Sequence, residues 1–267
     1  MSKHTYVVRA VLSVHGAVSR ETVLPMMEAM ARLKMQAADW GIRLDRSQLS
    51  LLRAYADLLT QYELANVIGT RDWQRVVTDH LVDALSCLLI KDLRRGASVI
   101  DVGTGAGLPG IPLAIAQPSL SMTLLEVMEK KVRFLEHARS TLGLRNSQVL
   151  HARAEEAARR PTYREAFDLA TARALAALPV VIEYCAPLVR SGGAILAMKG
   201  RLAEEELSTG LAASQEIGVA LREIQPVKYR VSLPQKERRL VVFDKVEATS
   251  EKFPRKAGLA KKRPLGS

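Results

Sequence analysis

Residues 99–113 are the part of the chain best suited to bind a nucleotide-like ligand. An apolar run ends near Asp101, and Gly103, Gly105 and Gly107 follow at alternate positions before a second apolar run begins. This order predicts a buried β-strand, a turn and a helix, because glycines allow positive φ angles and let a ligand approach bare backbone. We therefore expect the turn to hold the polar end of a nucleotide-like cofactor.

Two residues beside the glycines distinguish between cofactors. Residues 105–110 match the GxGxxG fingerprint of dinucleotide-binding enzymes, which is a weak signal by itself. The charge of Asp101 would repel a pyrophosphate, and Pro109 lacks the N–H group that phosphate binding at a helix entry needs. A nicotinamide dehydrogenase is therefore disfavoured. S-adenosylmethionine (SAM) carries a sulfonium cation, an amino-acid group and no phosphate, so we expect Asp101 to face its positive end, directly or through water.

Two further acidic residues follow the next predicted strands. Glu126 ends the second strand, where its carboxylate can accept hydrogen bonds from both ribose hydroxyls. Ala154 and Glu155 follow the third strand, where backbone atoms can meet the adenine ring and the carboxylate can accept from the exocyclic amine. The alternative for Glu126 is an exposed strand end, and the alternative for Glu155 is the start of a charged helix.

Strands and helices alternate from Ala97 onward, and this arrangement would bring the candidate residues to one edge of a sheet. Alternation of this kind is typical of an α/β fold with a parallel sheet and right-handed crossovers. The last two predicted strands, 222–231 and 238–246, have only a short connection with Pro234 between them, so they are expected to form an antiparallel hairpin. The five parallel strands are predicted at residues 98–101, 122–126, 148–151, 167–172 and 194–199.

Both ends of the chain differ from this pattern. Helices are expected before residue 95, one near 24–38, one with a capping box at Asp45 and Gln48, and one after Asp72. Residues 252–263 contain six basic residues and no acidic one. We expect this tail to be mobile, because it cannot bury enough apolar surface to fold alone. Its function would be to bind a polyanion or only to solubilise the protein.

The composition limits the classes of function. The 267 residues carry a net charge of +11, which favours nucleic acid as a partner, with a merely basic surface as an equal alternative. Aromatic residues make up 4% of the chain, which argues against a base-stacking platform over a whole sheet face. The two cysteines and five histidines lack metal-ligand spacing, so no metal is expected. No segment reads as a signal peptide or membrane span, and we expect a cytoplasmic monomer.

Several motifs together resemble one family. They lie at residues 101–112, 129–135, 153–155, 171–174, 198–200 and 237–242, with similar tail motifs at 253–258 and 262–265. Over residues ~45–265 the chain resembles the bacterial small-subunit ribosomal RNA guanine-N7 methyltransferases, also called the glucose-inhibited division protein B family. The resemblance implies a Rossmann-like, SAM-dependent methyltransferase fold, whose seven-stranded, mostly parallel sheet ends in the hairpin. This domain would span 96–247, between a helical region at 1–95 and the basic tail at 248–267.

The resemblance also implies a substrate and site residues. The acceptor would be N7 of guanine 527, in the 530 loop of 16S rRNA, presented by the free RNA or by the 30S subunit. Cofactor contacts would fall on Gly103, Leu108, Ala154, Glu155 and Arg173. The physical argument from the turn and the strand ends adds four further residues to the predicted cofactor site, namely Asp101, Gly105, Gly107 and Glu126.

The N-terminal helical region departs from the family pattern in part. The family's Asn-Leu-Thr is replaced by a sequence without the hydroxyl, Asn66-Val67-Ile68, and the Trp-Asn that usually precedes it is absent. The family's His-x-x-Asp pattern is retained as His80 and Asp83. We expect Asn66 and His80 to line the active site from a helical lid, although a histidine on an apolar helical face can also be a core residue.

The predicted reaction requires no general base, because guanine N7 is an unprotonated lone pair. The chain lacks both the Asn/Asp-Pro-Pro-aromatic motif of amino-directed enzymes and the Pro-Cys pair of cytosine-C5 enzymes. We expect Arg173 to contact the cofactor, guanine O6 or a phosphate rather than N7, and Lys199 and Arg238 to bind phosphates or orient the base. Each cation could instead form a surface ion pair. Alternative functions are methylation of another RNA or of a protein, and a non-catalytic RNA-binding assembly factor.

Overall fold

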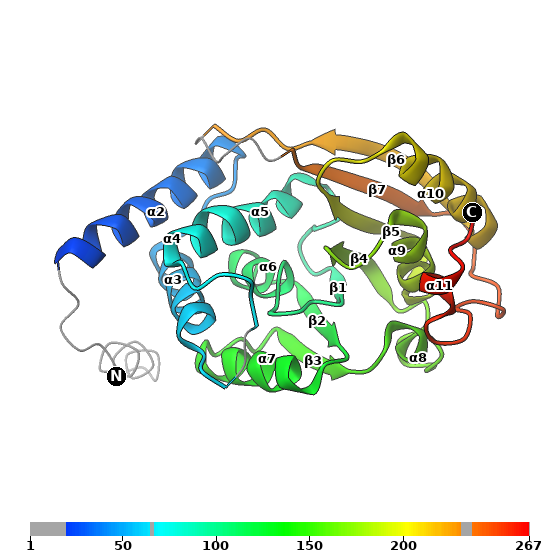
Figure 1. The fold of residues 1–267 in the computed structure, drawn as a ribbon, viewed down its shortest axis with the longest axis horizontal. Helices are drawn as coiled ribbons and strands as arrows, with labels where there is room; N and C mark the ends of the chain where they lie inside the picture. Colours follow the sequence, from blue (N-terminus) through cyan, green and yellow to red (C-terminus); the bar gives the residue numbers. More distant parts are fainter. Residues whose placement is uncertain (1–19, 65–66, 231–236, 267) are drawn as a thin grey trace.

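Seven strands form a single sheet in the order β3-β2-β1-β4-β5-β7-β6 (Figure 1). This arrangement is seen in a computed structural model that describes residues 20–64, 67–230 and 237–266. The first five strands are parallel, and β7 lies antiparallel between β5 and β6. Their bounds are β1 Ser98–Val102, β2 Ser121–Glu126, β3 Ser147–His151, β4 Phe167–Arg173, β5 Val189–Lys199, β6 Val219–Pro226 and β7 Arg239–Lys245. The predicted α/β fold with a terminal hairpin is confirmed.

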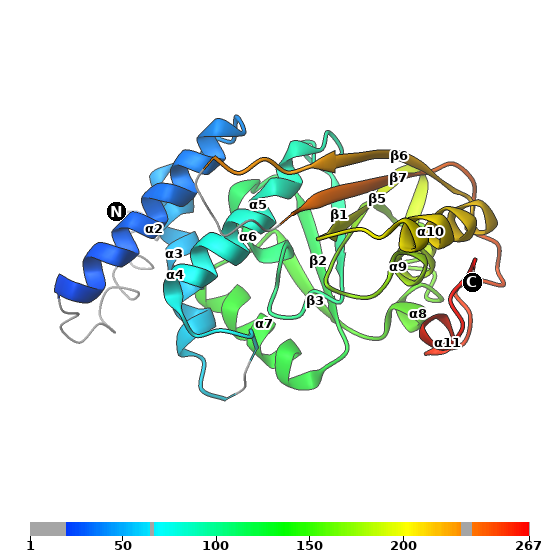
Figure 2. The same cartoon turned by 45° about the horizontal axis from the view of Figure 1, so that its top comes forward.

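Helices cover both faces of the sheet (Figure 2). On one side lie α2 Arg20–Asp39, α3 Arg46–Gln61, α4 Trp73–Arg75, η1 Val76–Leu81, α5 Val82–Leu85, η2 Ser86–Leu89, α6 Gly110–Ala116 and α7 Glu129–Thr141. On the other lie α8 Ala154–Ala157, α9 Leu178–Cys185, η3 Ala186–Leu188, α10 Glu204–Ile217 and α11 Leu259–Lys262. Strand residues supply their side chains to the two apolar clusters alternately, as the two-residue repeat of a β-strand requires.

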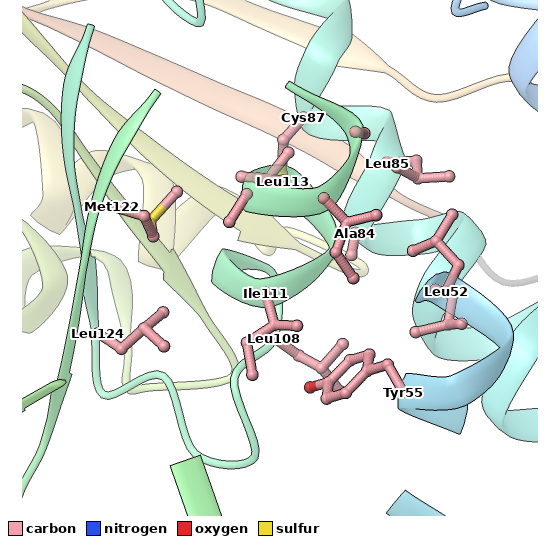
Figure 3. Close-up of a cluster of buried hydrophobic side chains, with 14 of the residues drawn as sticks. Leu52, Tyr55, Ala84, Leu85, Cys87, Leu108, Ile111, Leu113, Met122 and Leu124 are labelled. Carbon is pink, nitrogen blue, oxygen red and sulfur yellow. The ribbon is translucent and has the colours of Figure 1, made fainter. Parts of the chain in front are cut away.

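The N-terminal helices share one core with the sheet. Figure 3 shows Leu52 and Tyr55 of α3 facing Leu108 and Ile111, with Leu124 of β2 on the opposite side of these two residues. The capping box is confirmed: Gln48 N donates to Asp45 Oδ1 at 2.8 Å, and Asp45 N donates to Gln48 Oε1 at 2.9 Å. Gln48 Nε2 also donates to Ala116 O at 2.9 Å, which ties the start of α3 to the end of α6.

The sheet register brings the predicted cations to one edge. Arg173 ends β4 opposite Met198, and Lys199 ends β5 opposite Arg239, the first residue of β7. Because β7 runs antiparallel, its beginning lies beside the carboxyl ends of β4 and β5. Ligands of open α/β sheets bind at this edge, where the strand order reverses between β1 and β4.

The hairpin differs in length from its prediction. β6 ends at Pro226 rather than at residue 231, because the next residues leave the sheet and pack against α2. Lys228 O accepts a bond from Trp40 Nε1 at 3.0 Å, and Arg230 N donates to Gln36 Oε1 at 2.7 Å. The predicted turn at Pro234 lies outside the described residues.

The prediction of a mobile C-terminal tail is wrong for residues 248–266. Phe253, Ala260 and Leu265 are buried in the cluster on the α9 face of the sheet. Arg164 Nη2 donates to Thr249 O at 2.7 Å, which attaches the segment to the loop before β4. The tail has too little apolar surface to fold alone, but its buried apolar side chains and its hydrogen bonds dock it on a core that already exists. In the part of the chain that the structure describes, no helix is long and apolar enough to cross a membrane.

Candidate functional site

The glycine-rich turn connects β1 to α6 and adopts the backbone angles that its sequence predicts. Gly103, Gly105 and Gly107 have φ angles of 66°, 63° and 94°, a region that other residues adopt at a cost. Thr104 N donates to Leu125 O at 3.0 Å, and Tyr55 OH donates to Ala106 O at 2.5 Å. The turn is therefore held between the end of β2 and helix α3.

Asp101 does not face a ligand, so its predicted contact with the positive end of SAM is wrong. Its side chain is fully buried and accepts three hydrogen bonds from the protein. Oδ2 accepts from Thr104 Oγ1 at 2.5 Å and from Gly110 N at 2.9 Å, and Oδ1 accepts from Thr171 Oγ1 at 2.9 Å. Asp101 thus closes the turn and joins β1 to β4. Burial raises its pKa, against the opposing effect of these hydrogen bonds.

The backbone of the turn has little capacity to bind phosphate. Five N–H groups between Thr104 and Gly110 donate within the protein, those of Thr104, Gly105, Gly107, Leu108 and Gly110. Pro109 has no N–H group to offer. A pyrophosphate would need several of these donors to be free. The structure therefore supports the choice of SAM over a dinucleotide, although the role assigned to Asp101 in that choice was wrong.

Glu126, at the end of β2, has a carboxylate that the backbone holds in one orientation. Its Oε2 accepts from Gly105 N at 2.9 Å, and its Oε1 accepts from Val127 N and Met128 N, both at 2.8 Å. These bonds hold the carboxylate still, and its oxygens keep lone pairs for further donors. The residue lines a cavity, and its contact with the ribose stays a prediction.

A cavity of about 290 Å³ lies at the carboxyl edge of the sheet, close to the lower end of the range for small-molecule sites. It is lined by the ends of β1 and β2, by residues 152–153 after β3, by α8 and by residues 174–175. Four predicted cofactor-binding residues line it: Gly103, Glu126, Ala154 and Glu155. Tyr184, Lys131 and Lys261 also line it, and the prediction did not include them.

Glu155 lies in the cavity wall with two partners. Its Oε1 accepts from Gly258 N at 2.9 Å, and its carboxylate forms a hydrogen bond with the Tyr184 hydroxyl. Burial, followed by the charge of Glu155, raises the pKa of Tyr184 to about 12, so this phenol stays protonated near neutral pH and can donate. The cavity thus contains two oriented carboxylates, which suit the hydroxyl and amine donors of an adenosyl group.

Other predicted cofactor residues lie outside the cavity lining. The Leu108 side chain packs in the core beside Ile111, so only its backbone could meet a ligand (Figure 3). A Cβ atom at Gly107 would lie 2.5 Å from Ile111 Cδ1 and 3.1 Å from Leu135 Cδ2. Gly107 is therefore required by the packing of α6 against α7, and its predicted role as a ligand-facing residue is wrong. A Cβ atom at Gly105 meets only Lys131 Nζ, at 3.9 Å, and Gly103 O, at 4.0 Å.

These two glycines give a matched pair of substitutions. Gly105→Ala is expected to lower the free energy of unfolding by about 1 to 2 kcal/mol, the cost of a positive φ angle for alanine. Gly107→Ala carries the same cost and also forces Ile111 to move, which adds about 1 to 3 kcal/mol. Urea unfolding of both variants measures the difference. Equal losses of stability would contradict the assignment of Gly107 to packing.

Beside the cavity, Asp83 gathers three side chains from distant parts of the sequence. Its Oδ2 accepts from Arg173 Nη1 at 3.1 Å, and its Oδ1 accepts from Arg238 Nε and Tyr229 OH, each at 3.1 Å. His80 Nδ1 lies 3.3 Å from Arg173 Nη2. We name Asp83, His80, Arg173, Arg238 and Tyr229 the Asp83 cluster. Three members, His80, Arg173 and Arg238, are predicted site residues. The sequence analysis assigned no role to the other two, Asp83 and Tyr229.

The local helix geometry helps to present this cluster. Residues 76–81 form a π-helical segment, a conformation that often occurs at functional sites, and His80 lies within it. Asp83 follows in α5 and is buried. An aspartate between apolar residues of a helix needs a partner when the helix is buried, and this pattern was the signal in the sequence that could have pointed to Asp83.

Lys199, another predicted residue, does not join the cluster. Lys199 Nζ pairs with Glu206 Oε1 at 2.5 Å and donates to Ala176 O at 3.0 Å. The structure therefore agrees with the alternative for Lys199, an ion pair within the protein. Asn66 lies outside the described residues. Arg173 does not line the cavity, but the next two residues, Ala174 and Leu175, do.

Comparison with known proteins identifies relatives over most of the chain. A family model described as rRNA small subunit methyltransferase G matches residues 48–238. A protein named ribosomal RNA small subunit methyltransferase G from Rubrobacter xylanophilus is 45% identical over 89% of this chain and 91% of its own length. The protein of the same name from Acetivibrio thermocellus is 38% identical over 86% and 93%.

Solved structures with low sequence identity share the fold. A branched-chain polyamine synthase mutein from Thermus thermophilus superposes with a TM-score of 0.53 at 15% identity, covering 74% of this chain and 65% of its own. A protein described as a sarcosine dimethylglycine methyltransferase from Galdieria sulphuraria reaches a TM-score of 0.50 at 12% identity, covering 74% and 98%. At these identities the similarity concerns the Rossmann-like fold alone.

Proposed function

Because the chain belongs to the rRNA small subunit methyltransferase G family and is a SAM-dependent methyltransferase, we propose that it methylates N7 of a guanine in 16S rRNA. The guanine would be number 527, in the 530 loop. The observation that carries the proposal is the position of the Asp83 cluster beside the cavity with the two carboxylates. Cofactor and acceptor sites would then meet at the end of β4.

The cavity residues would bind SAM, which supplies an activated methyl group when bound. Glu126 would accept from the ribose hydroxyls, since three backbone N–H groups hold its carboxylate in place. Glu155 would accept from the adenine amine. The backbone between β1 and α6 would pass close to the amino-acid part of SAM, where the glycines leave room.

The Asp83 cluster would orient the acceptor base. N7 presents a lone pair, so no side chain has to remove a proton before the methyl group is transferred. A bidentate arginine contact to O6 and N7 would occupy that lone pair. Asp83 and His80 hold the Arg173 guanidinium from one side, which leaves it able to contact guanine O6 or a phosphate. Catalysis would then come from alignment, which can lower a barrier by ~7–11 kcal/mol.

The charge of the protein suits this acceptor. A net charge of +11 favours the approach of RNA, and binding should weaken steeply as the salt concentration rises. A guanine in folded RNA would have to leave its stack to reach the cavity. We propose that the enzyme acts in this way as a monomer in the cytoplasm, on free 16S rRNA or on the 30S subunit.

Methyl transfer from labelled SAM to unmethylated 16S rRNA and to 30S subunits tests the proposal. The labelled base is located by borohydride and aniline cleavage, which is specific for N7-methylguanine, followed by primer extension. We expect one stop, next to guanine 527. Label on another RNA or on a protein would favour the alternative that the enzyme methylates a different substrate. SAM binding with no transfer to any acceptor would favour the assembly factor.

A further inference from the structure

The last residues of the chain are fastened to the domain next to the SAM cavity. We name residues 249–265 the C-terminal segment. Arg255 Nε donates to Glu183 Oε1 at 2.8 Å, and its Nη2 donates to Glu183 Oε2 at 2.5 Å, a two-point contact with a residue of α9. Glu183 is 1% exposed, so loss of this guanidinium would leave a buried carboxylate without its cation. The contact therefore favours one docked position of the segment.

The docked segment supplies part of the cavity wall. Gly258 N donates to Glu155 Oε1 at 2.9 Å, and Lys261, three residues later, lines the cavity. Gly258 has a φ angle of 78°, which turns the chain into α11 at this point. Glu155 is 6% exposed and has the Tyr184 hydroxyl as its other partner. A residue assigned to the adenine of SAM is thus oriented by the backbone of the C-terminal segment.

We propose that the C-terminal segment is a component of the SAM site, and that its docking and SAM binding stabilise each other through Glu155. This inference rests on the proposed role of Glu155 under the function above. Arg255 is then a positioning residue, which acts on the cofactor through Gly258 and Glu155.

The physical reason is preorganisation. While Gly258 N is bonded to one oxygen of Glu155, the carboxylate has one orientation in the cavity wall. If the segment leaves, Glu155 gains rotational freedom and water, and the cavity loses Lys261 from its lining. SAM would then have to order the carboxylate on binding, which lowers affinity. By thermodynamic linkage the effect is reciprocal: if the docked segment strengthens SAM binding, bound SAM must stabilise the docked position of the segment by the same factor.

Hydrogen exchange of the wild-type protein tests directly whether bound SAM stabilises the docked C-terminal segment. We expect saturating SAM to slow exchange of the amides of residues 258–262 at least fivefold, within the usual range of coupling between sites. The Gly258 amide is the most informative, because it donates to Glu155. Exchange that is unchanged by SAM at these amides would overturn the proposal.

Arg255→Ala and Lys252→Ala form a matched pair for calorimetry. Both remove one cation from the C-terminal segment, but Lys252 is exposed, and its Nζ lies 3.5 Å from Glu216 Oε1 and 4.9 Å from the centroid of the Phe253 ring. We expect the Kd for SAM to rise about tenfold in Arg255→Ala and to stay within twofold in Lys252→Ala. A Kd within twofold of the wild type in Arg255→Ala would also overturn the proposal.

Kinetics separate this role from a general loss of structure. Arg255→Ala is expected to raise the KM for SAM about tenfold with kcat nearly unchanged, whereas partial unfolding would lower kcat. Circular dichroism and the Tm confirm that both variants are folded. A protein that binds SAM with this coupling, yet methylates no 16S rRNA, would refute the proposed substrate and leave the inference standing.

Discussion

Replacing Arg173 with alanine is expected to lower kcat/KM for methylation of 16S rRNA about 100-fold while the protein stays folded. Arg173 ends β4 immediately before two residues of the cavity wall, and Asp83 and His80 orient its guanidinium. Its loss would remove the cation proposed to hold the guanine or its phosphate. Even a small displacement of N7 from the line of the breaking S–CH3 bond would slow the reaction, because the proposed catalysis depends on alignment.

The fold should tolerate this change because Asp83 keeps two donors. Arg238 Nε and Tyr229 OH still bond to its Oδ1, so the buried carboxylate retains a cation. Arg190→Ala is the matched control: it also removes an arginine paired with an aspartate, but at the other end of β4 and β5, where Arg190 contacts Asp168. Single-turnover assays of both variants compare their rates of methyl transfer to 16S rRNA. Near-normal transfer by Arg173→Ala would exclude Arg173 from the acceptor site.

Replacing Asp101 with alanine is expected to lower the free energy of unfolding by about 3 kcal/mol or more. Three donors would lose their acceptor in the core, namely Gly110 N, Thr104 Oγ1 and Thr171 Oγ1. A buried unsatisfied group costs about 1 to 3 kcal/mol, and the turn that precedes α6 would lose its anchor. SAM binding should fall with the order of the turn.

Guanidinium chloride unfolding measures this loss, with Thr171→Val as the control. That substitution removes one of the three donors without leaving Asp101 unpaired, so it should cost only about 1 kcal/mol. A loss below 1 kcal/mol in Asp101→Ala would show that Asp101 does not anchor the turn.

The raised pKa of Asp101 leads to a further expectation, about pH. Burial makes the ionised form less favourable in the folded protein than in the unfolded chain, so the folded state holds the proton to higher pH. Asp101 therefore contributes most to stability below its unfolded pKa of about 3.9, and this contribution falls as pH rises through the raised folded pKa. An asparagine side chain cannot ionise, so Asp101→Asn should lose less stability relative to the wild type at pH 7 than at pH 4. A difference independent of pH would contradict the shift.

The cofactor loop and most of the sheet could be predicted from local sequence. Positive φ angles at Gly103 and Gly105, and the strand ends at Glu126 and Arg173, depend on residues that are close together in the chain. Parallel strands then bring their carboxyl ends to one edge without further information. This is why the residues lining the cavity include Glu126 and Glu155 as predicted.

The errors concern side chains whose partners are far away in the sequence. Asp101 turns inward because the register of β1 against β4 places it opposite Thr171, and no local pattern reveals that pairing. The C-terminal segment has the composition of a mobile tail, but Glu183, 72 residues before Arg255, gives it a docking point. Lys199 is paired by Glu206, which comes from the helix after its strand.

The sequence by itself predicted a methyl-donor site made of a glycine-rich turn and two carboxylates, one at the end of a strand and one just after the next strand, because backbone angles and strand ends are local properties. Only the tertiary structure decided which of the candidate residues face that site. It turned Asp101 and Gly107 toward the core, joined Arg173, Arg238 and His80 through Asp83, and brought Gly258 to Glu155. The physical reason is that a buried charge or N–H group takes whichever partner the packing provides, and that partner can lie anywhere in the chain.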